Sequence, residues 1–400
     1  MLQGKTVLLG VTGGIAAYKM PNVARMLKKL HCNVHVLMTQ NATNFITATT
    51  FETLTGNKCL IDTFDRNFEF SVEHVALAKQ ADLVLIAPAT ANVIGKIAGG
   101  IADDMLTTTV MACTCKCLIA PAMNHNMYHN SIVQENLDKL RRHGYEMIDP
   151  VRGMLANGDT GDGKLPPEET LVEYVLRELA CPKDMDGMKV LVTAGPTREA
   201  IDPVRFITNY STGKMGYAVA KMAMYRGAEV TLVTGPTDLV PPMFVETVQV
   251  ETAEQMYEAV TARAKEQDFI IKAAAVADYR PAETAAEKIK KSGGMELILE
   301  RTKDILAELG ADKGKTVLCG FSMETEHMLE NSRAKLRKKN LDMIAANNLR
   351  QEGAGFGTDT NILTLITAEE EKQLARMSKE EAAECLLEEL IKIRRKRAEI

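Results

Sequence analysis

The chain has 400 residues, with 48 Lys or Arg and 53 Asp or Glu side chains, and its formal net charge is −5. Hydrophobic residues make up 46% and charged residues 25%, an ordinary globular composition that excludes a disordered or collagen-like chain. The acidic excess argues against nucleic acid as the main partner. Aromatic residues at 5%, with no Trp, argue against a surface that stacks single-stranded bases. The length predicts roughly two to four domains.

No segment predicts export or a membrane anchor. The first residues lead directly into a strand-like run and lack the basic, apolar and small-residue pattern of a signal peptide. Apolar runs such as 83–87 are far shorter than the ~20 residues that cross a bilayer. The eight cysteines include no pair with zinc-knuckle spacing, so we expect reduced structural thiols. These features predict a cytoplasmic protein.

Short apolar runs alternate with amphipathic segments along both halves, a pattern typical of βαβ units and parallel sheets. The segment 152–167 is rich in glycine and predicts a long loop or flap, and the polar segment 181–188 predicts a linker. We therefore predict an α/β protein with two tandem doubly wound domains, at 1–180 and 189–400. The expected strands are 6–11, 33–38, 82–87 and 116–120, then 189–193, 229–234, 269–273, 316–320, 342–345 and 362–366; the expected helices include 16–30, 131–143 and 168–179.

A glycine-rich turn containing Gly13, Gly14 and Ile15 lies between the first strand and the first helix. Glycine allows close approach of the backbone to a ligand, and a helix N-terminus offers N–H groups to an anion. The spacing is not G-x-G-x-x-G, so a mononucleotide phosphate fits better than a dinucleotide. On this motif alone, a turn that is merely tight explains the glycines equally well.

Polar residues also follow the next three strands. They are Thr39 after the second strand, Thr90 and Asn92, next to Ala89, after the third, and Asn124 after the fourth. Ligands of open α/β sheets bind beyond the carboxyl ends of the strands. Loops rich in Thr and Asn suit neutral hydrogen bonding to the ribityl chain and ring edge of a flavin.

Residues 1 to about 180 resemble the homo-oligomeric flavin-containing cysteine decarboxylases. The resemblance rests on Gly-Val-Thr-Gly13-Gly14-Ile15, Glu-His74-Val, Ala-Pro-Ala-Thr-Ala-Asn92 and Pro-Ala-Met-Asn124-His-Asn-Met127. It implies a flavodoxin-like domain that binds FMN, with His74 supporting thiol oxidation, Asn124 holding the substrate carboxylate and Met127 closing the pocket. An acylated cysteine nitrogen cannot form a Schiff base. Oxidation of the thiol to a thioaldehyde supplies the missing electron sink, and the cofactor then returns the electrons.

One position departs from that family. Its flap carries a cysteine that protonates the enethiolate, and this chain has Asn157 there. An amide is not a competent acid at neutral pH. Either Asp159 or a water replaces the cysteine, or this half decarboxylates poorly and is regulatory.

The first half also contains a histidine pair that resembles a metal-binding pattern. His125 and His129 have helical i,i+4 spacing, but no glutamate of the H-E-x-x-H kind accompanies them. The sequence therefore argues against a metal.

In the second half, Asn209 and the run Ser211-Thr212-Gly213-Lys-Met215 follow a strand. A P-loop is excluded because it requires glycine at the position of Thr208 and a hydroxyl at that of Met215. Ser211, Thr212 and Gly213 instead open a helix, where they either bind a phosphate or form an ordinary N-cap.

Lysines gather around later strand ends. Lys272 ends an apolar strand, Asp278 follows it, and Lys288 comes soon after. Lys335 and Lys339 lie four apart on one helix face. Their combined charge suits a nucleoside triphosphate and its leaving pyrophosphate.

The whole chain resembles the bifunctional coenzyme A biosynthesis family, in which a phosphopantothenoylcysteine decarboxylase is joined to a Rossmann-like phosphopantothenate–cysteine ligase. The resemblance implies that CTP and Mg²⁺ activate phosphopantothenate as an acyl-cytidylate, which cysteine then converts to the amide. It implies that Asn209 binds the acyl-cytidylate intermediate. It also implies that Lys288 stabilises charge during the transfer step. It also implies a trimeric first half and a dimeric second half, which can build a dodecamer. The implied CTP site comprises Ser211, Thr212, Gly213, Lys272, Ala273, Ala274, Asp278, Lys288, Lys303, Asp304, Ile305, Leu306, Phe321, Lys335 and Lys339.

Overall fold

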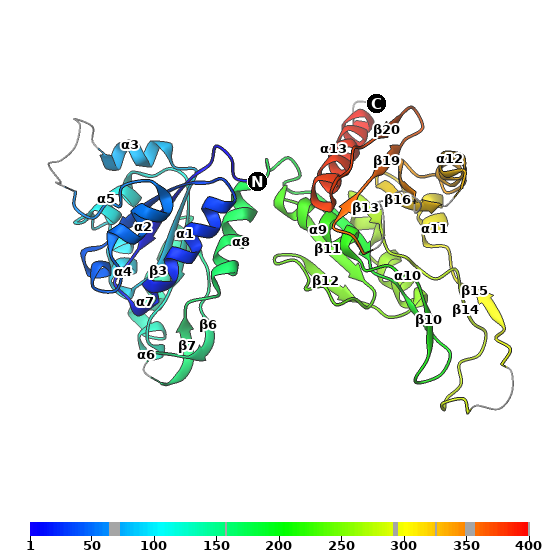
Figure 1. The fold of residues 1–400 in the computed structure, drawn as a ribbon, viewed down its shortest axis with the longest axis horizontal. Coiled ribbons are helices and arrows are strands. Elements are labelled where there is room, and N and C mark those ends of the chain that lie inside the picture. Colours follow the sequence, from blue (N-terminus) through cyan, green and yellow to red (C-terminus); the bar gives the residue numbers. More distant parts are fainter. Residues whose placement is uncertain (64–72, 157, 291–294, 325, 349–356, 399–400) are drawn as a thin grey trace. The chain divides into compact units, whose positions relative to one another are not determined.

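The chain forms two compact units, Met1–Cys181 and Pro182–Ile400 (Figure 1). A computed structural model describes residues 1–63, 73–156, 158–290, 295–324, 326–348 and 357–398. Each unit has its own sheet, so each is described by itself. Within the described residues, no helix has the length and apolar character needed to cross a bilayer.

The first unit is built on a five-stranded parallel sheet with strand order β2-β1-β3-β4-β5. This flavodoxin-like order confirms the predicted doubly wound fold. One face of the sheet packs against α3, α4, α5 and α7, and α1 contacts α2 and α8. The strands are β1 (Thr6–Val11), β2 (Asn33–Met38), β3 (Leu83–Ala89), β4 (Lys116–Pro121) and β5 (Glu146–Met147), and the helices are α1 (Met20–Lys29), α2 (Ala48–Thr55), α3 (Glu73–Gln80), α4 (Ala91–Gly99), α5 (Met105–Ala112), α6 (His125–Tyr128), α7 (Ser131–Arg142) and α8 (Glu168–Leu179).

The first helix begins later than its periodicity predicts. Residues Ile15–Lys19 form a 3₁₀ turn, and α1 starts at Met20 with Pro21 in its first turn. Proline has no N–H to donate, so it is tolerated at a helix start and not farther inside.

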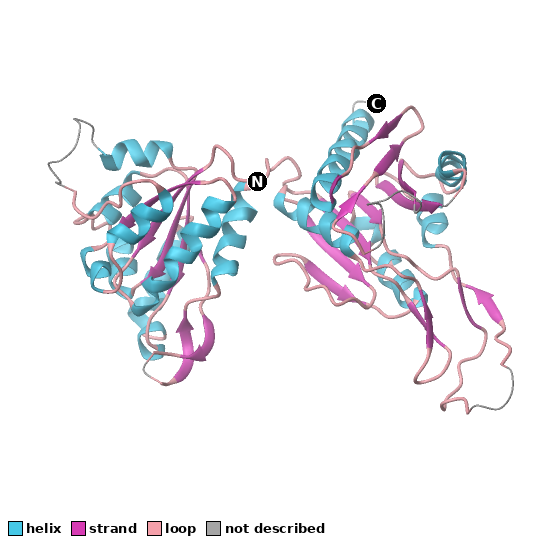
Figure 2. Cartoon of the chain, in the orientation of Figure 1, coloured by secondary structure: helices cyan, strands magenta, loops and turns pink. Residues whose placement is uncertain are grey.

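The glycine-rich segment predicted as a loop contains a hairpin instead. Strands β6 (Val151–Met154) and β7 (Thr160–Lys164) pair antiparallel (Figure 2). Main-chain pairing needs no apolar alternation, so the side-chain pattern did not reveal these strands. Asn157 lies outside the described residues.

The second unit contains an eight-stranded sheet with order β12-β11-β8-β13-β16-β17-β19-β20. Its first six strands are parallel in the Rossmann order, and β19 and β20 are antiparallel to their neighbours. The strands are β8 (Lys189–Ala194), β11 (Glu229–Thr234), β12 (Glu246–Gln249), β13 (Phe269–Lys272), β16 (Val317–Glu324), β17 (Met343–Asn348), β19 (Leu363–Ile366) and β20 (Glu371–Gln373), and the helices are α9 (Lys214–Tyr225), α10 (Ala253–Thr261), α11 (Ile305–Ala311), α12 (Met328–Lys338) and α13 (Lys379–Ala398).

The second unit also contains three short antiparallel strand pairs, which the sequence did not predict. They are too short to show a period of two in the sequence. The pairs are β9 (Arg198–Ala200) with β10 (Phe206–Thr208), β14 (Tyr279–Pro281) with β15 (Leu299–Arg301), and β18 (Thr360–Asn361) with β21 (Met377–Ser378).

The polar segment predicted as a linker packs onto the second unit. Met185 is fully buried, and its N–H donates to the carbonyl of Arg226 at 3.0 Å. Asp184 pairs with the Arg226 guanidinium, whose side chain is only 7% exposed. Residues 182–188 therefore form part of that unit's surface.

Candidate functional sites

The loops after β1 and β3 are tied together at the carboxyl edge of the first sheet. The Thr12 hydroxyl donates to the carbonyl of Pro88 at 2.7 Å and accepts the N–H of Thr90 at 3.1 Å. Thr12 is completely buried. No sequence pattern points to Thr12, because its role depends on a partner 76 residues away.

Gly13 lies where the loop after β1 comes very close to the loop after β2, so the position leaves no room for a side chain. A Cβ at Gly13 would lie 2.5 Å from the Cβ of Asn41, in the loop after β2. Gly14 and Ile15 follow at the start of the 3₁₀ turn, and Ile15 is 56% exposed. The structure thus brings the glycine turn beside the Thr39–Asn41 segment.

Thr39 offers a specific test of whether a ligand fits this edge. Its side chain is only 7% exposed, and among the described residues its Oγ1 has no hydrogen-bond partner. An unpaired buried hydroxyl costs about 1–3 kcal/mol. A polar ligand atom is the kind of partner that would satisfy it.

The third strand contributes a helix N-terminus to the same edge. Thr90 is the N-cap of α4 and accepts the N–H of Val93 at 3.5 Å. Ala89 is buried in β3, and Asn92 is exposed in the first turn. The α4 N-terminus and the glycine turn together suit a phosphate group.

Asn124 caps α6 beyond the fourth strand, and its side chain accepts the N–H of Asn126 at 2.9 Å. Met127, on the same helix, is 49% exposed. The β6–β7 hairpin docks beside them, because the N–H of Met123 donates to the carbonyl of Gly163 at 3.0 Å. The hairpin and α6 therefore form one wall of the edge.

His74 is the second residue of α3, as its predicted place near a helix N-terminus requires. The helix packs against α5, and the side chain is half-buried. Within the described residues, no hydrogen bond joins His74 to the glycine turn or to Asn124. The structure therefore places His74 on α3 without joining it, in the described part of the chain, to the other residues proposed for this site.

The second unit has a cavity of about 710 Å³ at the carboxyl edge of its sheet. It lies at the ends of β8 and β13, where the strand order reverses and such folds bind ligands. The cavity brings together all but one of the residues predicted for this half. Its lining includes Asn209, Ser211, Thr212, Gly213, Lys272, Ala273, Ala274, Asp278, Lys303, Asp304, Ile305, Leu306, Phe321, Lys335 and Lys339.

The missing residue is Lys288, which does not line the cavity. It is exposed on the segment that follows β14. Figure 1 shows β14 and β15 projecting from the body of the second unit.

Helix α9 opens into the cavity without a side-chain cap. Its N-cap is Gly213, whose φ of 79° falls in the left-handed region that glycine tolerates. The Ser211 hydroxyl accepts the N–H of Gly213 at 3.3 Å and does not cap the helix itself. This arrangement favours the anion-binding interpretation over the ordinary N-cap.

Three lysines crowd one wall of the cavity. Burial and repulsion from Lys335 and Lys339 lower the pKa of Lys272 to about 8. Burial and repulsion from Lys339 also lower the pKa of Lys335, whose ammonium donates to the carbonyl of Phe321 at 2.9 Å. Lys339 pairs with Asp304 at 2.9 Å. The positive charges of these lysines repel one another. An anion that binds between them reduces this repulsion, which makes its binding free energy more favourable.

Lys303 is engaged at the rim. Its ammonium lies 2.6 Å from a carboxylate oxygen of Glu254 and 4.4 Å from the ring centre of Tyr257. The side chain is 54% exposed, so a ligand must compete with Glu254 for it.

A buried carboxylate, Asp202, holds the segment that carries Lys288, and no sequence pattern predicted this contact. We call the hydrogen bonds of Asp202 and Arg205 to this segment the Asp202 clamp. Asp202 accepts the N–H groups of Val204 and Arg205 at 2.8 Å and that of Ile289 at 3.1 Å. The Arg205 guanidinium pairs with the same carboxylate and donates to the carbonyl of Ile289 at 2.9 Å. These bonds hold the pKa of Asp202 well below its usual range.

The fold and these edges define a class of protein: a flavodoxin-like unit followed by a Rossmann-like unit, each with polar loops gathered at the carboxyl edge of its sheet. A family described as Flavoprotein matches residues 1–180. One described as DNA/pantothenate metabolism flavoprotein C-terminal domain matches residues 185–393.

Relatives named Coenzyme A biosynthesis bifunctional protein CoaBC match nearly the full chain. The Bacillus subtilis protein is 46% identical over 395 residues, which cover 98% of this chain and 97% of that protein. The Escherichia coli K12 protein is 41% identical over 395 residues, with the same coverage of 98% and 97%. A solved structure of the C-terminal domain of such a protein is 46% identical and covers 52% of this chain and 95% of that one, with a TM-score of 0.45.

The chain therefore belongs to the family of bifunctional coenzyme A biosynthesis proteins. This confirms the family predicted from the sequence and, with it, a bifunctional enzyme whose first half is a flavoprotein domain.

The Asp202 clamp predicts a local effect. Replacing Asp202 with Asn removes the charge that three N–H groups and Arg205 share. Each hydrogen-bond partner left unsatisfied costs about 1–3 kcal/mol of stability. We therefore expect the amides of Val204, Arg205 and Ile289 to undergo hydrogen–deuterium exchange at least about tenfold faster.

Asp312→Asn is the matched control, because Asp312 is 85% exposed and its ion pair with Lys265, the one it forms among the described residues, spans 4.0 Å. It should leave those amides unchanged. Unchanged exchange in Asp202→Asn would show that the clamp does not hold the Lys288 segment.

Proposed function

We propose that the chain converts phosphopantothenate and cysteine into phosphopantetheine by two consecutive reactions. The second unit performs a CTP-dependent ligation, and the first an FMN-dependent decarboxylation. The observation that carries the proposal is the convergence of Lys272, Lys335 and Lys339 on one cavity. A nucleoside triphosphate is the ligand whose charge relieves their repulsion.

In the ligation, the carboxylate of phosphopantothenate attacks the α-phosphorus of CTP and releases pyrophosphate. The cysteine amine then attacks the acyl carbon of the acyl-cytidylate and expels CMP. The lysine wall and the α9 N-terminus stabilise the phosphate charge. The Asn209 amide donates to the carbonyl of Ala275 at 2.9 Å, which holds its side chain at the cavity wall, where it would contact the intermediate.

Mg²⁺ is expected to bind mainly through the triphosphate, since this ion usually takes only one or two protein carboxylates at phosphate sites. Asp278 is exposed on the cavity wall, whereas Asp304 already pairs with Lys339. Asp278 is therefore the carboxylate that would hold the ion.

In the decarboxylation, the glycine turn and the α4 N-terminus would hold the FMN phosphate, and Thr39 and Asn92 would bond its polar atoms. FMN supplies reversible oxidation of the substrate thiol. Asn124 positions the departing carboxylate, and His74 holds or moves the thiol proton.

We also propose a homo-oligomer in the cytoplasm, with a trimeric first half and a dimeric second half. Ile15, Tyr18 and Met127 support this, because 56%, 60% and 49% of their surfaces are exposed near the proposed FMN site. Apolar side chains left exposed at a site are typical of a contact surface.

One assay tests the division of labour. Purified protein is incubated with phosphopantothenate, cysteine, CTP and Mg²⁺, and pyrophosphate, CO₂ and phosphopantetheine are measured. Lys288→Gln should reduce amide formation by about 10²–10³-fold, the effect of losing one charge-stabilising group. The same variant should decarboxylate supplied phosphopantothenoylcysteine at the normal rate.

Lys265→Gln is the control, since Lys265 is 89% exposed away from the cavity. Loss of both reactions in Lys288→Gln would refute the separation of the two sites. Pyrophosphate without CO₂ in the unmodified protein would restrict activity to the second unit and make the flavin half regulatory.

The pKa of Lys272 predicts pH-dependent binding of CTP. The protonated amine attracts the triphosphate, and its pKa without ligand is about 8. Affinity should therefore be highest below pH 8 and should fall as the pH rises toward 9.5, by at most about tenfold per pH unit for one proton. Calorimetric titration across this range measures the slope.

Lys272→Arg keeps its charge throughout the range and should flatten the slope, whatever its absolute affinity. Lys265→Arg should retain the slope. A wild-type affinity that does not change between pH 7 and 9.5 would contradict the role of Lys272.

Gly13→Ala should lower the FMN content. The new methyl group would lie 2.5 Å from the Cβ of Asn41, so the two loops must separate. We expect a loss of bound FMN of about tenfold or more, the cost of roughly 1–3 kcal/mol for overpacking. Absorbance at the flavin bands relative to protein measures it.

Gly95→Ala provides the comparison in the same unit. Its Cβ would meet only the Asn136 amide nitrogen at 3.8 Å, an ordinary contact. Full flavin content in both variants would exclude the glycine turn from the binding site.

A further inference from the structure

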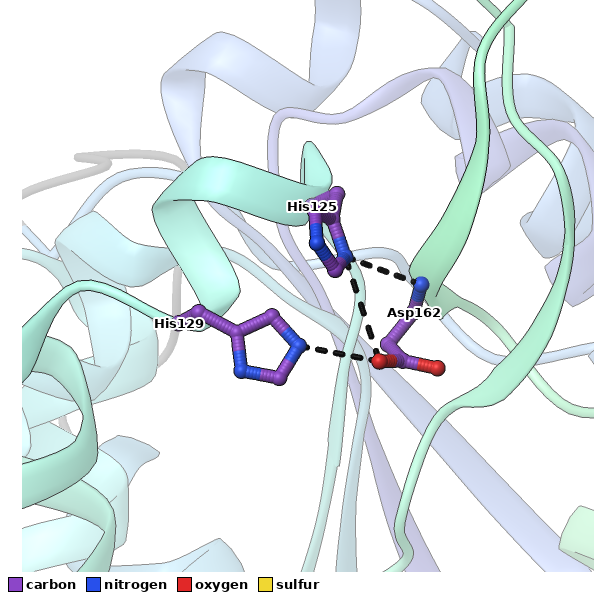
Figure 3. A group of neighbouring side chains, drawn as sticks. All are labelled: His125, His129 and Asp162. Carbon is purple, nitrogen blue, oxygen red and sulfur yellow. Dashed lines mark hydrogen bonds and ion pairs between the residues drawn. The ribbon is translucent and has the colours of Figure 1, made fainter.

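A cluster of two histidines and one aspartate joins α6 to the β6–β7 hairpin (Figure 3). His125 begins α6, and His129 is its C-cap residue, so the two rings share one face of the helix. Their ring centres are 4.4 Å apart. Asp162 reaches them from β7. Neither proposed reaction uses these side chains.

The three ligand atoms face a common point. The His129 Nε2 lies 2.9 Å and the His125 Nδ1 3.9 Å from the same carboxylate oxygen of Asp162. All three atoms lie within 4.8 Å of one another. Zinc bonds to nitrogen and oxygen are about 2.0–2.2 Å long, so the two rings and the Asp162 carboxylate must move closer together for one ion to bind all three atoms.

The tautomer of His125 suits ligation. The N–H of Asp162 donates to its Nδ1 at 3.1 Å, so that nitrogen carries a lone pair directed at the hairpin. The ring lies close to the hairpin backbone, since a Cβ at Gly161 would lie 2.8 Å from its Cγ. Metal binding would break this hydrogen bond and turn the Nδ1 lone pair away from the Asp162 N–H toward the ion.

The ligand chemistry selects the class of ion. Two imidazoles and one carboxylate suit Zn²⁺, Co²⁺ or Ni²⁺, whereas Mg²⁺ prefers oxygen ligands. The side chains of His125, His129 and Asp162 are 42%, 49% and 39% exposed. Water can therefore reach the ion and complete its coordination.

We propose that His125, His129 and Asp162 bind one divalent transition-metal ion of the Zn²⁺ class. The ion links α6, which carries Met127, to β7, and so clamps the hairpin against the helix. The sequence suggested no metal at this i,i+4 histidine pair, because no glutamate of the H-E-x-x-H kind accompanies it. The third ligand comes instead from a strand 33 residues beyond His129.

Cobalt titration of the full-length protein tests the site. We expect one equivalent of Co²⁺ to give visible d–d absorption without the thiolate charge-transfer bands that cysteine ligation produces. Loss of even an outer-shell partner of a metal ligand costs about 10–100-fold in affinity, so His129→Ala and Asp162→Asn should each weaken binding at least tenfold. All three side chains are half-exposed, so these variants should keep the circular dichroism of the parent.

His143→Ala is the matched control, an exposed histidine at the end of α7. It should bind Co²⁺ like the parent. Equal affinity in all variants, or thiolate bands in the parent, would overturn the assignment.

Proteolysis tests the clamp separately. Arg152 is exposed in β6, so trypsin cleavage there reports separation of the hairpin. Added Zn²⁺ should slow this cleavage several-fold in the parent and in His143→Ala, but not in Asp162→Asn. Equal slowing in all three would reflect inhibition of trypsin and would refute the clamp.

Discussion

Both units depend on the parallel alignment of their strands. Parallel strands end at one edge of the sheet, so the loops after β1, β3 and β4 meet in the first unit, and those after β8, β13 and β16 meet in the second. Residues far apart in sequence are thereby neighbours without any motif that links them. Both candidate sites follow from this constraint.

The carboxyl edges of the two sheets differ in charge, and this difference determines the kind of ligand that each edge suits. The first edge presents Thr and Asn side chains, and the buried Thr39 hydroxyl there has no hydrogen-bond partner within the described part of the chain. Such groups hold a cofactor by neutral hydrogen bonds and a helix N-terminus. The second edge holds lysines whose burial and mutual repulsion lower the pKa of Lys272 and of Lys335. That repulsion is stored in the protein without ligand and is released when a polyphosphate binds.

Buried polar residues connect the loops that carry the sites. Thr12 fixes the glycine turn to the loop after β3, and Asp202 fixes the segment that bears Lys288. Each is buried and accepts or donates several hydrogen bonds, so each is costly to replace. The His125, His129 and Asp162 cluster adds an exposed connection, between α6 and the hairpin.

The sequence by itself determined the two α/β units, their main strands and the lysines Lys272, Lys335 and Lys339 of the second unit's cavity, whereas the resemblance to a known family implied most of the other lining residues. Apolar runs mark buried strands, and lysines after strand ends mark an anion site, because both signals are local along the chain. Only the tertiary structure decided the β6–β7 hairpin, the packing of 182–188 on the second unit, the position of Lys288 outside the cavity, and the contacts of Thr12, Asp202 and Asp162. The hairpin forms through main-chain pairing that needs no apolar alternation. The contacts of 182–188, Thr12, Asp202 and Asp162 join segments far apart in the chain, and residue spacing carries no record of such contacts.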